Sequence, residues 1–206
     1  MISIVNYGSG NIQAICNIYG RLGVPYIVAS KPDEVRAGDK IVLPGVGAFD
    51  QAMSELERSD LRAVLDECVL GSRRPILGIC VGMQLLAQSS EDGGGPGLGW
   101  IAGHVRKFDR SRFTGVGRLP HMGWNTVAMT RDNGLLRGID LSRGFYFLHS
   151  YYFSCDEPAD ELARTDYGGE YACAVNRGNV YGVQFHPEKS HQAGIQLLKN
   201  FADGIA

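Results

Sequence analysis

Apolar residues in the first half of the chain fall into two alternating patterns. Short continuous apolar runs cover residues 2–5, 26–28, 40–43 and 75–79, and such runs are typical of buried strands. Between the first two runs, apolar side chains return every three or four positions, as on one face of a helix: Ile12, Ile15, Cys16, Tyr19 and Leu22. A further helix is predicted around residues 61–69. This alternation predicts an α/β fold of three layers, in which helices flank a mostly parallel central sheet.

The pattern changes at the glycine-rich segment 93–97, which lacks the Gly-Lys-Ser/Thr ending of a phosphate loop and is predicted to be a flexible loop. Short β-like runs follow, and we expect them to add antiparallel strands to the main sheet: 105–108, 126–129, 145–147 and 152–155. A last strand is predicted over 180–185. A last helix is predicted after an N-cap at Ser190, with three side chains facing the core: Ile195, Leu198 and Phe201.

Composition limits the partners that the chain is expected to have. Its 206 residues, 44% of them hydrophobic, suit a single domain over 1–206 with a substantial core. The net charge is −2 and Lys and Arg do not cluster, so nucleic acid is not an expected partner. No apolar run approaches the roughly 20 residues of a membrane helix, and no targeting segment precedes the first strand, so no membrane is expected either.

The cysteines and histidines show no spacing typical of metal ligands. The five cysteines are an odd number and form no C-x-x-C pair, and the five histidines form no H-x-H or H-x-x-x-H pair. We therefore expect no metal and no cofactor, and free thiols in a reducing cytoplasm.

Cys80 lies in the sequence Gly78-Ile79-Cys80-Val81-Gly82, between a strand-like run and the helix-like residues 83–87. A sharp strand-to-helix turn presents a nucleophile at the edge of a sheet, and it needs glycines where the backbone leaves no room for Cβ atoms. The alternative is an ordinary buried cysteine in the core. The two glycines favour a nucleophile.

His186 and Glu188 follow the last predicted strand and complete the candidate catalytic set. A free thiol has a pKa of about 8.5, so a nucleophilic cysteine needs a partner that takes its proton. His186 is the candidate base, and Glu188 could accept the second imidazole N–H and fix the tautomer. Alone, either residue reads as an ordinary surface histidine or carboxylate. Because the carboxyl ends of parallel strands share one edge, we expect both side chains to lie near Cys80.

Attack on an acyl carbon creates an oxyanion, which needs hydrogen-bond donors. The Val81 amide, at the start of the helix after Cys80, is one candidate. The loop at residues 44–49, with Gly45, Val46 and Gly47 at its centre, could supply a second amide, although alone it would read as a plain turn.

Six motifs are spread over the chain: 7–11 (YGSGN), 44–49 (PGVGAF), 78–86 (GICVGMQLL), 120–125 (PHMGWN), 149–151 (HSY) and 184–190 (QFHPEKS). Together they resemble the class I, triad-type glutamine amidotransferases. The cysteine and His-x-Glu motifs are shared by the whole class, whereas 120–125 and the short chain resemble the glutaminase subunits of imidazole glycerol phosphate synthase.

The resemblance implies that Cys80 attacks the side-chain amide of glutamine, that His186 passes the proton to the leaving ammonia, and that water hydrolyses a glutamyl thioester. It also implies a substrate-binding set: Gly47, Val81, Gln84, Asp92, Ser150 and Tyr151. The acid could be Glu91 or Asp92, because the family tends to carry Glu where this chain has Asp92.

The resemblance further implies a heterodimer with a (β/α)8-barrel cyclase, which receives the ammonia and forms imidazole glycerol phosphate and an aminoimidazole carboxamide ribotide in histidine biosynthesis. Four residues match positions near that contact: Asn11, Trp124, Tyr146 and Lys189. Tyr146 could equally belong to the core. Glutaminase activity is expected to be weak until the partner binds its ligand, and a peptide flip at residues 45–47 is a candidate switch.

Three other functions stay open at this point. The same glutaminase chemistry could feed an aminosugar pathway for surface polysaccharides. The fold could serve a non-catalytic binding or regulatory module, although such a module has no need of the complete Cys80, His186 and Glu188 set. A general cysteine peptidase is the third, but no peptide cleft is evident in the sequence.

Overall fold

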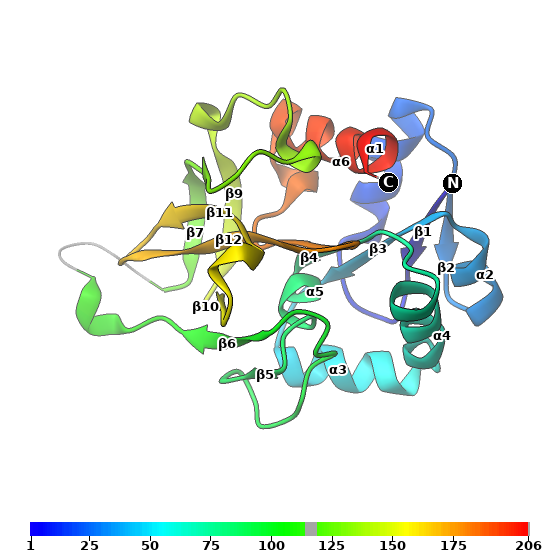
Figure 1. Cartoon of the computed structure of the whole chain (residues 1–206), viewed down its shortest axis with the longest axis horizontal. Coiled ribbons are helices and arrows are strands. Elements are labelled where there is room, and N and C mark those ends of the chain that lie inside the picture. Colours follow the sequence, from blue (N-terminus) through cyan, green and yellow to red (C-terminus); the bar gives the residue numbers. More distant parts are fainter. Residues whose placement is uncertain (114–118, 206) are drawn as a thin grey trace.

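The computed structural model describes residues 1–113 and 119–205, and its main feature is a long mixed sheet (Figure 1). In the described residues this sheet has eleven strands, with a central order of β2-β1-β3-β4-β13-β12-β10-β6-β5. Its first five strands are parallel: β2 (Tyr26–Ala29), β1 (Ile2–Val5), β3 (Lys40–Gly45), β4 (Ile76–Cys80) and β13 (Val180–Val183). Strand β4 is buried along its whole length, as expected of a parallel strand that helices cover on both faces.

Helices lie on both faces of the parallel strands (Figure 1). One face carries α1 (Ile12–Leu22) and α6 (His191–Gly204), and the other carries α3 (Phe49–Arg58) and α4 (Arg62–Asp66), which continues as a π turn at Glu67–Gly71. The short α2 (Pro32–Ala37) packs against β1 and β2. This arrangement confirms the predicted α/β fold with its flanked, mostly parallel sheet.

The second half of the chain extends the sheet with antiparallel strands, as predicted. Strands β12 (Glu170–Arg177), β10 (Tyr151–Cys155) and β6 (Gly103–Lys107) continue it from β13, and the short β5 (Ser89–Ser90) pairs parallel with β6. Strand β11 (Glu161–Asp166) joins β12 to β8 (Ala128–Met129). A separate antiparallel pair is formed by β7 (His121–Asn125) and β9 (Phe145–His149), so the strand predicted at 145–147 does not join the main sheet as expected. Short 3-10 turns complete the described structure: Arg110–Arg112, Gly134–Leu136, Leu141–Arg143, Pro158–Asp160 and Pro187–Lys189.

Some boundaries differ from the sequence predictions. The helix predicted at 83–87 is a single turn, α5 (Val81–Gln84), because the next carbonyls are used elsewhere: Leu85, Leu86 and Ala87 accept hydrogen bonds from the amides of Leu98, Ile101 and Gly99. The last strand ends at Val183 rather than 185. In the other direction, β3 runs on to Gly45, so the loop predicted at 44–49 begins only at Val46.

Ser190 occupies the N-cap position of α6, but its side chain does not cap the helix. Its hydroxyl donates to the carbonyl of His186 at 2.6 Å and accepts from the amide of Tyr146 at 3.0 Å. The predicted core contacts of the helix are confirmed for Leu198 and Phe201, while Ile195 is only partly buried. Ser190 thus joins β9 to the segment that carries His186.

No helix in the described ranges has both the length and the apolar character needed to cross a bilayer.

Candidate functional site

Cys80 ends β4 with a positive φ of 56° and a ψ of −112°, a conformation that is strained for a residue with a side chain, and α5 begins at the next residue. The glycines around it allow the backbones to approach closely. A Cβ at Gly78 would lie 2.6 Å from the Gly82 carbonyl oxygen, one at Gly45 would lie 2.5 Å from the Gly82 amide nitrogen, and one at Gly82 would overlap the Leu43 carbonyl. This geometry is that of a nucleophile elbow.

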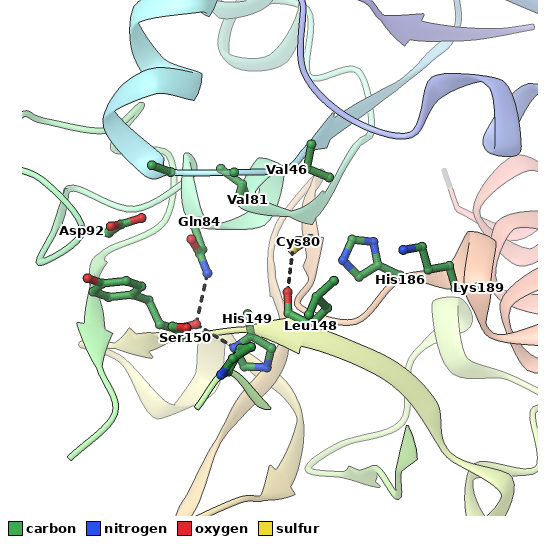
Figure 2. A pocket seen from close by; sticks show the side chains of 14 residues that line it. Val46, Cys80, Val81, Gln84, Asp92, Leu148, His149, Ser150, His186 and Lys189 are labelled. Atoms are coloured by element: carbon green, nitrogen blue, oxygen red, sulfur yellow. Dashed lines mark hydrogen bonds between the residues drawn. The ribbon is translucent and has the colours of Figure 1, made fainter. Parts of the chain in front are cut away.

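His186 and Glu188 form a buried pair beside this turn. Strand β13 pairs parallel with β4, so the segment after it reaches the same edge of the sheet as Cys80. The His186 Nδ1–H donates to Glu188 Oε1 at 2.8 Å, and the two side chains are 4% and 1% exposed. The second oxygen, Glu188 Oε2, is buried without a hydrogen-bond partner among the described residues. The imidazole of His186 lies beside Cys80, as Figure 2 shows.

Two effects act in opposite directions on the pKa of His186. Burial disfavours the imidazolium, whereas Cys80 and Glu188, on either side of the ring, favour it and raise the pKa to about 10. The site therefore holds a protonated imidazole beside Cys80.

A cavity of about 410 Å³ opens in front of Cys80 (Figure 2). All six residues predicted to bind substrate line it, together with Cys80 and His186: Gly47, Val81, Gln84, Asp92, Ser150 and Tyr151. Residues that sequence analysis did not assign to the cavity also line it: Ala48, Pro120, Leu148 and His149. Lys189, predicted as an interface residue, reaches the cavity as well. The structure thus brings together in one cavity residues from distant parts of the sequence.

The amide of Gln84 is fixed by two hydrogen bonds. Its Nε2 donates to the carbonyl of Tyr151 at 3.1 Å and to Oε1 of Gln184 at 3.0 Å. The Nε2 of Gln184 in turn lies 3.8 Å from Cys80 Sγ, a contact that the motif 184–190 does not predict by itself. Because both Nε2 hydrogens of Gln84 are used, its Oε1 is the atom left to face a ligand.

Asp92 and Glu91 point to different places. Asp92 lines the cavity, and its Oδ2 accepts from the amide of Phe49 at 3.0 Å, at the start of α3. Glu91 is exposed, pairs with Arg106 at 3.1 Å and accepts from the amide of Lys107 at 2.7 Å. Only Asp92 is therefore placed to meet a ligand in the cavity.

The candidate oxyanion loop is held in one orientation. The Val46 amide donates to the Ser9 hydroxyl at 3.0 Å, and the same hydroxyl donates back to the Val46 carbonyl at 2.9 Å. Gly47 follows with φ +89°, a conformation that favours glycine. Gly45 is buried in β3 opposite Cys80 and does not line the cavity. The Val46 amide is thus occupied by Ser9 in this structure.

The four residues predicted at a partner interface differ in how far they are exposed to solvent. Trp124 is 47% exposed and stacks on His191 with centroids 5.2 Å apart. Tyr146 lies opposite Trp124 in the β7·β9 register, is half-buried, and has Lys189 Nζ 5.7 Å from its ring centroid. Asn11 is half-buried at the start of α1. Of the four, Trp124 and Lys189 are therefore exposed, whereas Asn11 and Tyr146 are half-buried.

Comparisons with known proteins agree with this geometry. The family model described as glutamine amidotransferase class-I matches residues 3–205. Two curated relatives, each described as imidazole glycerol phosphate synthase subunit HisH, come from Bdellovibrio bacteriovorus, with 52% identity over 98% of this chain and 100% of the relative, and from Leptospira borgpetersenii, with 48% identity over 98% and 99%.

Solved structures share the fold at low sequence identity. A crystal structure of a glutamine amidotransferase aligns with a TM-score of 0.73 and 18% identity over 98% of this chain and 97% of that chain. PurLQS from Thermotoga maritima aligns with a TM-score of 0.68 and 17% identity over 97% and 96%. The match over nearly the whole chain and the high identity to curated relatives confirm the resemblance found in the motifs. This chain belongs to the class I glutamine amidotransferase family and, within it, to the HisH subunits of imidazole glycerol phosphate synthase.

Proposed function

We propose that Cys80, His186 and Glu188 hydrolyse glutamine to glutamate and ammonia, and that the ammonia passes to a (β/α)8-barrel cyclase subunit in histidine biosynthesis. The observation that carries the proposal is the buried His186–Glu188 pair beside a cysteine on a nucleophile elbow. A charged imidazole next to a thiol at the mouth of a cavity is arranged for nucleophilic attack on an acyl carbon.

The reaction follows from these positions. Cys80 Sγ, whose proton is taken up by His186, forms a bond to the side-chain carbonyl carbon of glutamine, and the carbonyl electron pair moves to the oxygen. When that pair returns, the carbon–nitrogen bond breaks and His186 gives its proton to the leaving ammonia. Water then attacks the glutamyl thioester and transfers a proton to His186, and collapse releases glutamate and the Cys80 thiolate.

The cavity walls suit the charged end of glutamine. The Asp92 carboxylate faces the cavity and would attract the α-ammonium group, and Gln84 Oε1 would accept one of its hydrogens. The backbone at Ser150 and Tyr151, where β9 leads into β10, also lines the cavity. Burial and the neighbouring Asp92 charge raise the pKa of Tyr151, so its hydroxyl is neutral and can donate.

The oxyanion would be stabilised by the Val81 amide and by an amide of the 46–48 loop. Val81 follows Cys80 directly and lines the cavity, as do Gly47 and Ala48. The Val46 amide would join them only after release from Ser9. Low activity without a partner is the expected consequence.

The partner is proposed to dock over the face that carries Trp124. Aromatic residues are frequent anchors of interfaces, and Trp124 and the neighbouring Met122 are 47% and 63% exposed. Lys189 lines the cavity next to Tyr146, so a partner there would cover the exit of the ammonia. All five cysteines are free, which suits work in a reducing cytoplasm.

The experiment that tests the proposal is a glutaminase assay of the purified chain, alone and with the cyclase subunit of the same genome and its ribotide ligand. A large rise in glutamate release with both present supports the histidine pathway. No rise, with Cys80 still alkylated by a glutamine analogue, would retain the triad but contradict this partner. The aminosugar pathway would then be the next to test, whereas the names of the curated relatives favour the histidine pathway.

A further inference from the structure

A buried chain of polar side chains connects β7 to the cavity wall and plays no part in the reaction steps above. His121 comes from β7, His149 from β9 and Tyr171 from β12, and they are 2%, 7% and 4% exposed. The Tyr171 hydroxyl lies 2.9 Å from His121 Nδ1 and 3.0 Å from His149 Nε2. Tyr171 therefore joins the two histidines, which face each other in the β7·β9 register.

The position of each proton in this chain follows from the partners. The Tyr151 carbonyl, 2.7 Å from His149 Nδ1, can only accept, so Nδ1 carries the hydrogen. Burial lowers the pKa of His149 to about 3, so the ring is neutral and its Nε2 accepts from the Tyr171 hydroxyl. The Tyr171 oxygen must then accept from the Nδ1–H of His121.

The hydrogen bond between Asn125 and His121, at the β7 end of this series, has the same donor-to-acceptor direction. Burial lowers the pKa of His121 to about 4, so this ring is neutral too, and its Nε2 accepts from Asn125 Nδ2 at 3.4 Å. Every hydrogen bond thus points from β7 toward the Tyr151 carbonyl. With one hydrogen per link, no other arrangement of neutral side chains satisfies all of these partners.

This series of hydrogen bonds ends at the Tyr151 carbonyl, which belongs to the cavity wall. The Tyr151 carbonyl accepts from both His149 Nδ1 and Gln84 Nε2, so both of its lone pairs are used and the backbone at the cavity wall is fixed. The carbonyl of Leu148, next to His149 on β9, lies 3.9 Å from Cys80 Sγ. The other end lies on β7, which carries the exposed Met122 and Trp124.

We propose that Tyr171 is a positioning residue for glutamine binding: its hydroxyl holds neutral His149 as the donor that fixes the Tyr151 carbonyl, and links this wall to strand β7. The inference rests on the proposed function, because it assigns the cavity to glutamine. Tyr171 itself does not touch the substrate.

A spectroscopic measurement tests the proton arrangement without any reaction. Long-range ¹H–¹⁵N correlation spectra of the full chain, with the five histidines assigned by single substitutions, should show His121 and His149 as neutral rings protonated at Nδ1. In Tyr171→Phe the ¹⁵N signal of His149 Nε2 should shift to that of a ring nitrogen without a hydrogen-bond donor, while Nδ1 keeps its hydrogen for the Tyr151 carbonyl. A ring protonated at Nε2 in the wild-type protein would overturn the inference.

Kinetics with the partner present test the role in binding. Tyr171→Phe should raise KM for glutamine about tenfold, with kcat changed less than about threefold, as expected for one lost buried hydrogen bond away from the reacting atoms. Tyr152→Phe is the matched control, because its ring lies 5.4 Å from Tyr171 and its hydroxyl makes no hydrogen bond to the described residues. The control should keep the wild-type KM.

A second pair of variants covers the case in which Tyr171→Phe folds poorly. His149→Asn can still donate an amide hydrogen from the place of Nδ1, whereas His149→Leu cannot, so the Leu variant should have the higher KM. Equal values for the two variants, or a wild-type KM in a folded Tyr171→Phe, would overturn the inference alone. If the wild-type complex does not hydrolyse glutamine at all, the proposed function fails and the inference falls with it.

Discussion

The Ser9 hydroxyl holds both polar groups of Val46, accepting from its amide at 3.0 Å and donating to its carbonyl at 2.9 Å. Ser9 is 6% exposed and sits between Gly8 and Gly10, which have φ values of 102° and 100°. While this contact lasts, the Val46 amide cannot stabilise an oxyanion in the cavity. The structure therefore represents an arrangement in which one candidate donor is withheld.

Removing the hydroxyl should release the loop. We expect Ser9→Ala to raise glutamate release by the chain without partner ligand about fivefold, since the two lost hydrogen bonds favour the held orientation only modestly in net terms. The rate with partner and ligand should stay near that of the wild type. Ser54→Ala, on the exposed side of α3, is the control. A lower basal rate in Ser9→Ala would show that the held orientation is the productive one.

Glu188 acts through His186, so its loss should change the pH profile. Glu188 favours the imidazolium, and its replacement in Glu188→Gln lowers the pKa of His186 from its raised value of about 10. The imidazolium is then lost at lower pH, and the alkaline limb of kcat/KM should move toward neutral pH. The rate at the optimum should fall about 10²-fold or more. An unchanged alkaline limb would contradict the role given to this carboxylate.

Asp92 and Glu91 offer a direct comparison of two neighbouring acids. Asp92→Asn should raise KM for glutamine about 10- to 100-fold, because a carboxylate facing an ammonium group contributes more than a neutral hydrogen bond. The amide oxygen of Asn can still accept from Phe49, so the start of α3 should be retained. Glu91→Gln loses only its contacts to Arg106 and Lys107 and should keep the wild-type KM. The opposite ranking of the two variants would show that Glu91 binds the substrate.

Trp124 is expected to contribute to partner binding rather than to folding. Its ring is 47% exposed and contacts His191 and Tyr146, so Trp124→Ala should weaken complex formation about tenfold or more while the melting temperature changes little. Met129→Ala removes a side chain that is 46% exposed on β8 and serves as the control. Isothermal titration with the cyclase subunit measures both. Unchanged affinity together with a large loss of stability would place Trp124 in the core.

The parallel half of the fold could be predicted because its strands are short apolar runs, most of them buried as in residues 76–80, although the edge strand β2 is largely exposed. Helix α3 was missed although its buried residues have helical spacing: Phe49, Ala52, Met53 and Leu56. Strand β12 was missed because small residues such as Ala172, Cys173 and Ala174 give little contrast, yet they are buried. Hydrophobic pattern detects strands best when their side chains are large.

The reacting residues of the candidate site could be predicted because a few motifs carry them. Contacts that fix these motifs were not predictable, since they join residues far apart in the sequence. Gln84 and Gln184 are 100 positions apart, and His121 and Tyr171 are 50 apart. Ser9 belongs to a glycine-rich motif, 7–11, but its hydrogen bonds to Val46 depend on how two loops meet in space.

The central claim is that Cys80 forms a covalent bond to the glutamyl group. Acid-quenched samples taken during glutamine turnover by the partner-bound chain, digested and measured by mass spectrometry, should carry a glutamyl adduct on the peptide that contains Cys80. Cys80→Ala should lack the adduct and lose glutamate release by about 10⁴-fold or more, while still binding the partner and while Cys68→Ala keeps both. Glutamine hydrolysis retained in Cys80→Ala would contradict the account.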